Sequence, residues 1–296
     1  MFVGGLTLSG TMMHVQHVEE CPDLGPICDT QPQRPYQHDQ HLYSTDLTFD
    51  GELGLVPHLS FELVAALRQV TDRIHYLDLA GNPYTPPVPD YHHRNETLFG
   101  PTDPWLMLHG GGMLGSFSWG LKGGVTLPLG STVENPFALG REGLPHEHIQ
   151  FGTGTFDPLF GASLSRSFDQ VALAIWTLDR FTLGTNSFAY RSGHKLLAGA
   201  SASTSFGLAS WSFKGGLDVY RETPEHWSGI IETEGNVGRT DLLADLSASW
   251  RFSKRFSLNL GAKIPVYSHV QGEQATYPAI IDIGLGATLG GKETSP

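Results

Sequence analysis

Histidines are the residues of this sequence whose type and spacing suggest chemistry most directly. The chain holds fourteen of them, and most lie in or beside expected long connections. Neutral imidazole is a common ligand for Zn²⁺, Cu²⁺ and Ni²⁺, and closely spaced pairs can bind one ion together. The alternative is that histidine is simply a tolerated polar loop residue. The predicted metal ligands are His14, His17, His38, His41, His92, His93, His146 and His148.

Two cysteines, Cys21 and Cys28, stand in the segment CPDLGPIC. Two prolines and a glycine between them suit a tight turn closed by a disulfide in an oxidising compartment. The alternative is a pair of thiolate metal ligands. We favour the disulfide.

Catalytic motifs are weak in this sequence. A Ser/His/acid hydrolase needs a nucleophile beside a base, and no Gly-x-Ser-x-Gly elbow is present. Ser192 and His194 would share one face of a strand, but both residue types are common here. We therefore expect the protein not to be an enzyme and to require no cofactor.

Composition excludes several classes of protein. The 296 residues carry a formal net charge of −12, which argues against a nucleic-acid partner. No apolar run approaches the ~20 residues that a membrane-spanning helix needs. The start, MFVGGLTLSGTMMH, lacks the basic region and cleavage site of a signal peptide, so we expect a mature or truncated form.

Alternation of apolar and polar residues is the main structural signal. In TDLLADLSASWRF (240–252) the even positions are apolar, whereas the odd positions include Asp245 and Arg251. Such a period of two predicts a strand with one apolar face. The same pattern predicts twelve strands, at 2–15, 41–55, 58–74, 97–111, 116–129, 148–165, 169–182, 190–206, 209–221, 236–252, 255–269 and 276–290.

Short and long connections take turns along the chain, which is typical of an outer-membrane barrel. The single domain would span 1–296, with its strands over about 2–290. The principal long loops are predicted at 16–40, 75–96, 130–147 and 222–235.

The apolar faces decide the orientation of the sheet. A soluble sandwich buries its apolar face, whereas a membrane barrel turns that face to lipid. The strands are long, the polar faces hold small residues with charges of both signs, and aromatic residues lie beside the short turns. We therefore predict a polar lumen, closed by ion pairs or open as a pathway with a cation bias. Its charged residues would be Asp46, Asp50, Glu52, Glu62, Arg68, Lys122, Asp157, Lys214, Asp218, Asp245, Arg251, Lys263 and Asp282.

Four segments carry a resemblance to a known family: GPTDPWLML (100–108), LKGGVTLPLG (121–130), HIQFGTGTFDPLFGASLSRSF (148–168) and YPAIIDIGLGATLGG (277–291). The sequence resembles a bacterial outer-membrane family of transporters, related to phenol meta-pathway barrels and distantly to fatty-acid and hydrocarbon importers. The resemblance implies a monomeric or weakly associated barrel. The importers' plug has no counterpart here, so their ligand sites are not carried over.

Together these features predict an all-β protein, a twelve-stranded antiparallel up-and-down transmembrane barrel in the outer membrane of a Gram-negative bacterium. Short turns would be periplasmic and long loops extracellular. We expect a porin-like protein for passage or capture of a small solute, with a divalent metal ion (Zn²⁺, Cu²⁺ or Ni²⁺) bound by histidines at the mouth. The alternative is a structural barrel, closed by internal salt bridges, that serves a larger envelope complex through an unidentified protein partner.

Overall fold

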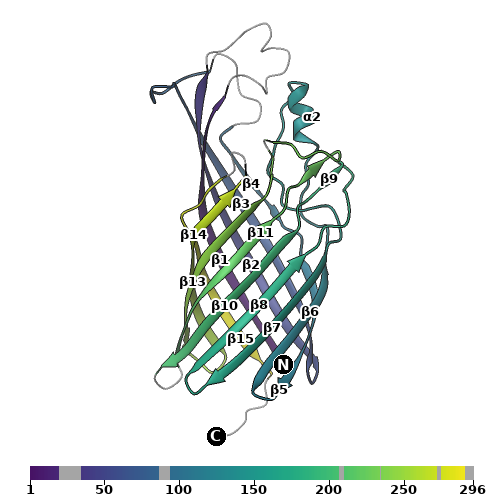
Figure 1. The fold of residues 1–296 in the computed structure, drawn as a ribbon, viewed down its shortest axis with the longest axis vertical. Coiled ribbons are helices and arrows are strands. Elements are labelled where there is room, and N and C mark those ends of the chain that lie inside the picture. Colours follow the sequence, from purple (N-terminus) through teal and green to yellow (C-terminus); the bar gives the residue numbers. More distant parts are fainter. Residues whose placement is uncertain (20–34, 87–93, 207–209, 234, 272–274, 291–296) are drawn as a thin grey trace.

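The computed structural model is a closed antiparallel barrel (Figure 1). It describes residues 1–19, 35–86, 94–206, 210–233, 235–271 and 275–290. No helix in this part of the chain is long and apolar enough to cross a bilayer. The first half of the wall contains β1 (Phe2–Glu19), β2 (Tyr36–Val56), β3 (Leu59–Leu77), β4 (Glu96–Pro101), β5 (Trp105–Leu114), β6 (Phe117–Thr126) and β7 (Pro158–Phe168). The second half contains β8 (Val171–Arg180), β10 (Lys195–Phe206), β11 (Trp211–Glu222), β13 (Arg239–Arg251), β14 (Phe256–Val270) and β15 (Ile280–Leu289).

The wall of the barrel has twelve strand positions, here called staves, as predicted. Each strand pairs with its neighbour in the chain, and β1 closes the circle by pairing with both β2 and β15. β4 and β5 pair with the upper and lower parts of β3 and form one stave, interrupted at 102–104. Closure gives β1 a partner on both edges, whereas β4, toward the long-loop end, pairs with β3 alone. A closed ladder satisfies the backbone groups that a bilayer cannot.

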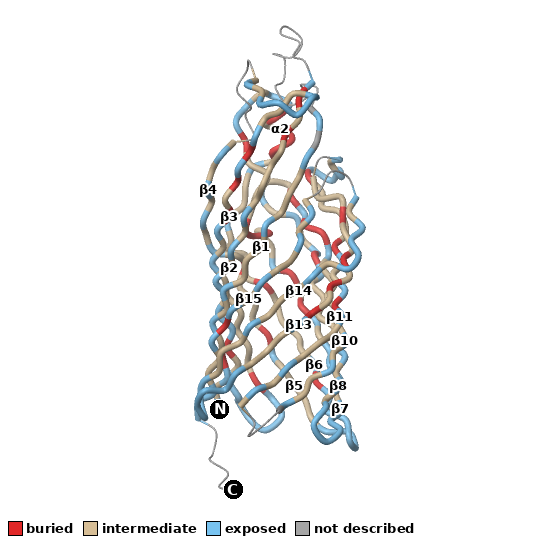
Figure 2. The backbone as a smooth tube through the Cα atoms, turned by 90° about the vertical axis from the view of Figure 1, so that its left-hand side faces the viewer, coloured by how far each residue is buried: buried red, intermediate tan, exposed pale blue. Residues whose placement is uncertain are grey.

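The apolar faces point outward. Leu47, Ile175, Leu246 and Ile283 are all exposed, with Ile175 57% and Leu246 52% accessible. Exposed and half-buried residues alternate along the strands of the cylinder (Figure 2). The sheet is therefore inverted relative to a soluble sandwich, as its period-two pattern indicated.

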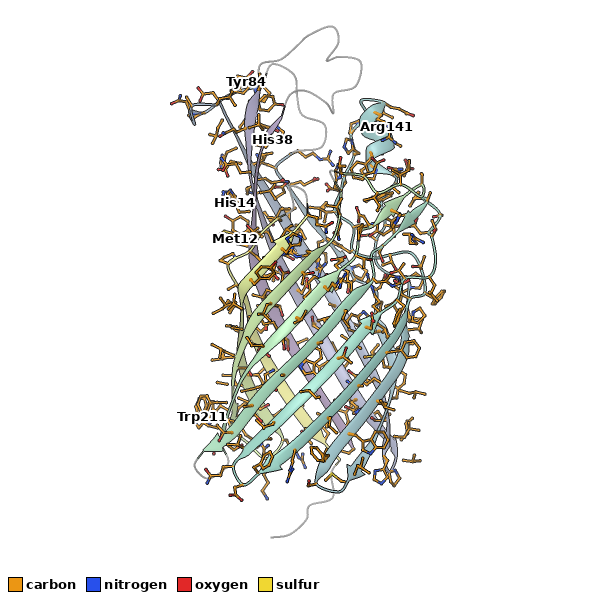
Figure 3. The ribbon with its side chains drawn as sticks, viewed as in Figure 1. Met12, His14, His38, Tyr84, Arg141 and Trp211 are labelled. Atoms are coloured by element: carbon orange, nitrogen blue, oxygen red, sulfur yellow. The ribbon has the colours of Figure 1, made fainter. Side chains whose placement is uncertain are left out.

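An aromatic band encircles part of the outer wall near the short turns. Trp211, Phe213, Trp250, Phe252 and Phe256 follow one another across three strands, and the Trp211 and Trp250 rings are stacked with centroids 5.8 Å apart. Trp211 lies near the lower end of the barrel (Figure 3). Such bands are typical of a membrane–water interface.

Several predicted boundaries are wrong. The strand predicted from 148 begins at Pro158, and the one predicted from 190 begins in the main sheet at Lys195. In 148–157 the chain instead folds back on the preceding connection, where Gly130 and Gly152 are so close that a Cβ on either would meet the other's backbone. β1 and β2 continue into the predicted loop 16–40, because their alternating ladder persists to the pair Glu19 and Tyr36.

Long connections build a cap at the other end of the barrel. It contains helix α2 (Pro136–Arg141) and the paired strands β9 (Tyr190–Arg191) and β12 (His226–Trp227) (Figure 1). Phe137, Tyr190 and Trp227 form its small buried core. The side chain of Asn135 caps α2 by accepting a hydrogen bond from the Ala138 amide at 3.1 Å.

Adjacent residues on β2 give a test of the inverted sheet. Leu47 points outward, and Thr48 lines the lumen. Leu47→Arg is expected to lower the free energy of unfolding in lipid vesicles by about 2–4 kcal/mol, because it places a charge on the lipid face. Thr48→Arg, the matched control, should cause a much smaller loss, since its guanidinium enters a polar lumen. Urea titration of the folded fraction measures both, and equal losses would contradict the orientation.

Candidate functional site

The lumen contains a cavity of about 820 Å³. Its wall comes from strands on both sides of the β1–β15 seam and from the opposite staves. Acidic and basic side chains line it in equal number, five of each. The acids are Asp46, Asp218, Glu222, Asp245 and Asp282, and the bases are Arg68, Lys195, Lys214, Arg239 and Lys263. The wall is therefore highly charged but carries no formal net charge.

Four charged residues form a chain across β11, β13 and β14. The Lys214 Nζ lies 2.6 Å from the Asp245 Oδ2, and the Lys263 Nζ lies 4.0 Å from that same oxygen. Lys263 also donates a hydrogen bond to Asp218. Each carboxylate thus has an ammonium beside it, which offsets much of the desolvation that the charges undergo in a narrow lumen.

The opposite wall carries Arg68 on β3. Its guanidinium donates two hydrogen bonds to Asp46, with Nε–Oδ1 and Nη2–Oδ2 distances of 2.7 and 2.6 Å. Lys195 on β10 and Tyr220 on β11 line the same cavity as Arg68. Five staves separate β3 from β11 in either direction around the barrel, so these side chains face the cavity from opposite walls.

A second, smaller cavity of about 300 Å³ lies toward the short-turn end. Serine and threonine side chains of β10, β11 and β13 contribute much of its wall. Lys214 and Ser247 line both cavities, so the two spaces meet at these residues. The ion pair of Lys214 and Asp245 therefore lies at the junction.

Buried polar contacts continue toward the long-loop end. Lys195 pairs with Glu222 at 3.1 Å, and the Arg239 Nε lies 2.8 Å from the Asp241 Oδ2. The Tyr277 hydroxyl donates to the same Asp241 oxygen at 3.0 Å. The predicted lumen charges did not include these residues, although Glu222, Arg239 and Asp241 have the parity of lumen residues within their strands. Tyr277 lies before the start of β15, so parity could not place it.

The GTFDP motif anchors the connection between β6 and β7. Asp103 accepts hydrogen bonds from the Gly130 amide at 2.9 Å and from the Thr153 amide at 2.7 Å. Thr155 Oγ1 donates to Asp157 at 2.8 Å, and the Asp157 amide donates to Thr126. These bonds explain why the segment before Pro158 packs against the barrel without joining the ladder.

The remaining predicted lumen charges occupy several settings. Lys122 pairs with Glu62 at 2.5 Å, and the Glu52 carboxylate lies 3.1 Å from the His109 Nδ1. Arg180 lies 3.8 Å from Asp157 at the base of the cap. Within the described ranges, three predicted lumen residues make no ion pair: Asp50, Arg251 and Asp282.

Two predicted histidine ligands meet across β1 and β2. His14 and His41 are register partners whose rings stack with centroids 4.8 Å apart. Asp39, which the sequence reasoning missed, lies between them, and its i,i+2 spacing to His41 was the signal available. His38 faces the other side of the sheet, against the rings of Tyr36 and Tyr76.

The other predicted ligands do not extend this cluster. The rings of His146 and His148 are 5.1 Å apart, and His146 Nδ1 hydrogen-bonds to the Leu144 carbonyl at 2.8 Å. Among the described residues, no third metal-ligating side chain joins that pair. The His17 side chain, His92, His93 and the pair Cys21 and Cys28 lie outside the described part of the structure.

Ser192 and His194 do not form a nucleophile and base. The Thr182 amide donates to the His194 Nδ1 at 3.0 Å. Ser192 instead hydrogen-bonds to the Thr182 hydroxyl at 2.9 Å and accepts from Arg180 at 3.2 Å. Both side chains thus contribute to the base of the cap.

A carboxyl pair joins the cap to β4. Burial, together with a hydrogen bond to Glu96, raises the pKa of Glu147 to about 8. The Arg94 side chain lies 3.2 Å from Glu96 and 3.6 Å from Glu147. Glu147 is therefore mostly protonated at neutral pH, and its proton allows the two carboxyl groups to stay in contact.

No family model matches the sequence, and no curated protein matches it. A search of solved structures finds an outer-membrane channel from Pseudomonas putida F1, 11% identical with a TM-score of 0.62, covering 97% of this chain and 94% of that one. This match shows a shared fold.

Two further structures match less well. The P. putida toluene transporter TodX is 9% identical over 96% of this chain and 89% of that one, with a TM-score of 0.48. A FadL homologue of Pseudomonas aeruginosa is 10% identical over 97% and 90%, with a TM-score of 0.43. The match to the P. putida F1 channel confirms the predicted barrel fold.

The carboxyl contact predicts a pH-dependent cap. The pKa of Glu147 is higher in the folded chain than in the unfolded one, so its contribution to stability is present at low pH and lost as pH rises through about 8. Amide hydrogen exchange of residues 142–150 should accelerate between pH 6 and 9 by more than the rise with pH that exposed amides show. Glu147→Gln should remove that excess, whereas Glu142→Gln, an exposed neighbour, should retain it. An excess that survives in Glu147→Gln would contradict the assignment.

Proposed function

We propose that this protein is an outer-membrane channel that admits a small polar solute through its charged lumen. The observation that carries the proposal is the cavity of about 820 Å³ inside a barrel whose exterior is apolar. In this orientation the short turns face the periplasm and the cap of long loops faces the exterior, the usual arrangement of such barrels. A similar fold in a channel from P. putida F1 supports the proposal.

The wall chemistry favours a polar solute. An apolar ligand requires a pocket lined mainly by hydrophobic and aromatic side chains. Here five acids and five bases line the cavity, each able to orient a donor or acceptor of the solute. Because the formal charges balance, the wall suits neutral or zwitterionic solutes better than ions of one sign.

The route leads from the larger cavity to the short-turn end. A solute leaves the level of Arg68 and Tyr220 and then passes Lys214 and Ser247, which both cavities share. The Lys214 side chain is 41% exposed, so it can move while Asp245 keeps its second neighbour, Lys263. The junction is thus the part of the route most sensitive to substitution.

A second candidate function is a structural barrel with a closed lumen. The observation that favours it is the set of ion pairs inside the barrel, such as Arg68 with Asp46 and Lys214 with Asp245. In that case the ion pairs would hold the barrel shape and the cap would contact an envelope partner. The two functions differ in conductance.

Planar-bilayer recordings test the channel. Wild type is expected to conduct, and Lys214→Ala should raise its single-channel conductance by roughly twofold and shift selectivity toward cations, because a fixed positive charge leaves the junction. Lys254→Ala removes the same charge from an exposed turn and should change neither value. Swelling of vesicles in neutral sugars and zwitterionic amino acids measures uptake of uncharged solutes.

Folded wild type and Lys214→Ala that both remain silent, with no vesicle swelling, would contradict the channel and favour the closed barrel. Heat-modifiable gel mobility verifies folding of each preparation.

A further inference from the structure

His14, Asp39 and His41 form a cluster, here called the outer-wall histidine cluster, on the outer face of β1 and β2. Leu6, Leu8 and Met12 of β1 are exposed on the outside of the barrel. His14 lies two residues beyond Met12, so it shares that outward face. Figure 3 shows His14 directly above Met12 on the flank of the wall. The cluster therefore lies just past the apolar band and does not face the lumen.

Three ligand atoms converge there. The Asp39 Oδ1 lies 2.7 Å from the His14 Nε2 and 3.6 Å from the His41 Nε2, and all three ligand atoms lie within 4.8 Å of one another. In a tetrahedral zinc site with bonds of about 2.0–2.1 Å, ligand atoms are separated by roughly 3.4 Å. Small side-chain rotations are enough to reach that geometry.

The backbone holds these side chains on a rigid frame. His14 and His41 lie directly opposite each other in the β1–β2 ladder, and Asp39 is two residues along the same strand face. On the other side of β1, the His14 amide donates to the Thr276 carbonyl at 2.9 Å, and the Thr276 amide donates back at 3.2 Å. A site built on paired strands needs little ordering to bind an ion.

His41 supplies an independent observation. Its Nδ1 is buried and has no hydrogen-bond partner among the residues that the structure describes. Its Nε2 points toward Asp39 at 3.6 Å, which is too long for a hydrogen bond. The Nε2 therefore faces the carboxylate without bonding to it, which leaves this nitrogen open to an ion held between the ring and Asp39.

The neighbouring Arg73 does not occupy the Asp39 carboxylate, which remains beside the two histidines. Arg73 is the register partner of His41 on β3, but its Nη1 donates to the Asp72 carbonyl at 2.8 Å. His75 is the register partner of Asp39 and is exposed on the same face. Two imidazoles and one carboxylate are a donor set that suits Zn²⁺, Cu²⁺ or Ni²⁺, with water or a further ligand in the open position.

We propose that the outer-wall histidine cluster binds one divalent transition-metal ion outside the lumen. The bound ion links β1 to β2 where these strands pass beyond the level of Met12 and Tyr43, at the headgroup side of the apolar wall. This site differs from the metal site expected at the mouth, because its ligands face away from the solute pathway. The inference does not depend on the proposed channel.

Metal titration of the full-length folded protein in detergent tests the site. After chelator treatment, wild type should bind one Zn²⁺ per chain at this site, and Cu²⁺ should give an electron paramagnetic resonance spectrum with two nitrogen ligands. His14→Ala and His41→Ala should each weaken binding at least tenfold and remove one nitrogen from the spectrum, roughly the loss expected when one of three protein ligands is deleted. Asp39→Asn should weaken binding while both nitrogens remain.

The double variant His146→Ala/His148→Ala is the matched control, because it removes two neighbouring histidines from the same end of the barrel. It should retain the affinity and the spectrum of wild type. The proposal would be overturned if wild type failed to bind the metal or if His14→Ala and His41→Ala bound it as wild type does. It would also be overturned if only the control lost binding. His14→Gln and His41→Gln serve if an alanine variant does not fold. Conductance should be the same with and without the metal, which separates this test from that of the channel.

Discussion

The structure depends on one constraint: a closed antiparallel ladder can have its apolar side chains on only one of its two surfaces. Successive side chains along a strand point to opposite faces. Because Leu246 and Ile283 point outward, their neighbours Asp245 and Asp282 point into the lumen. Closure through β1 and β15 then joins these inward rows into one polar interior. The lumen and its ion pairs follow from that arrangement.

Ion pairs in the lumen have two consequences. They compensate charges such as Lys263 and Asp218 that would otherwise be poorly solvated, and they leave the wall without formal net charge. A lumen of this kind selects by size and polarity more than by the sign of charge, whereas the outer-wall histidine cluster lies on the opposite surface and is independent of the solute pathway.

Much of the fold could be predicted from the sequence because the period-two signal is long and repeated. All twelve staves were predicted, and Leu246, Trp250 and Phe252 of the segment 240–252 are exposed on the outside. The segment 148–157 was misassigned because Phe156 has the same parity as Phe160 and Leu164 of β7 and so extends their alternation across Pro158. Its conformation is decided by tertiary contacts, the hydrogen bonds to Asp103 and the approach of Gly130 to Gly152, which local pattern cannot reveal.

The candidate sites were less predictable because they depend on register. Closely spaced histidines were expected to bind one ion together, whereas the structure pairs His14 with His41, 27 residues away on the next strand. The pairing of charges also depends on register. Lys263 on β14 meets Asp218 on β11 only because the turns align these strands with β13 between them. The spacing of Asp39 and His41 was visible, but without register nothing connected it to His14.

The inverted sheet can be tested most directly with two neighbouring positions on β14, Leu260 and Asn259. Each is changed to cysteine, in turn, in a chain whose Cys21 and Cys28 are replaced by serine, and each is labelled with a fluorophore in lipid vesicles. A label at Leu260→Cys should be quenched by a lipid-bound quencher, and one at Asn259→Cys by a water-soluble quencher, because Leu260 is exposed on the outer wall and Asn259 lines the lumen. The reverse pattern, or the same quenching at both positions, would contradict the account.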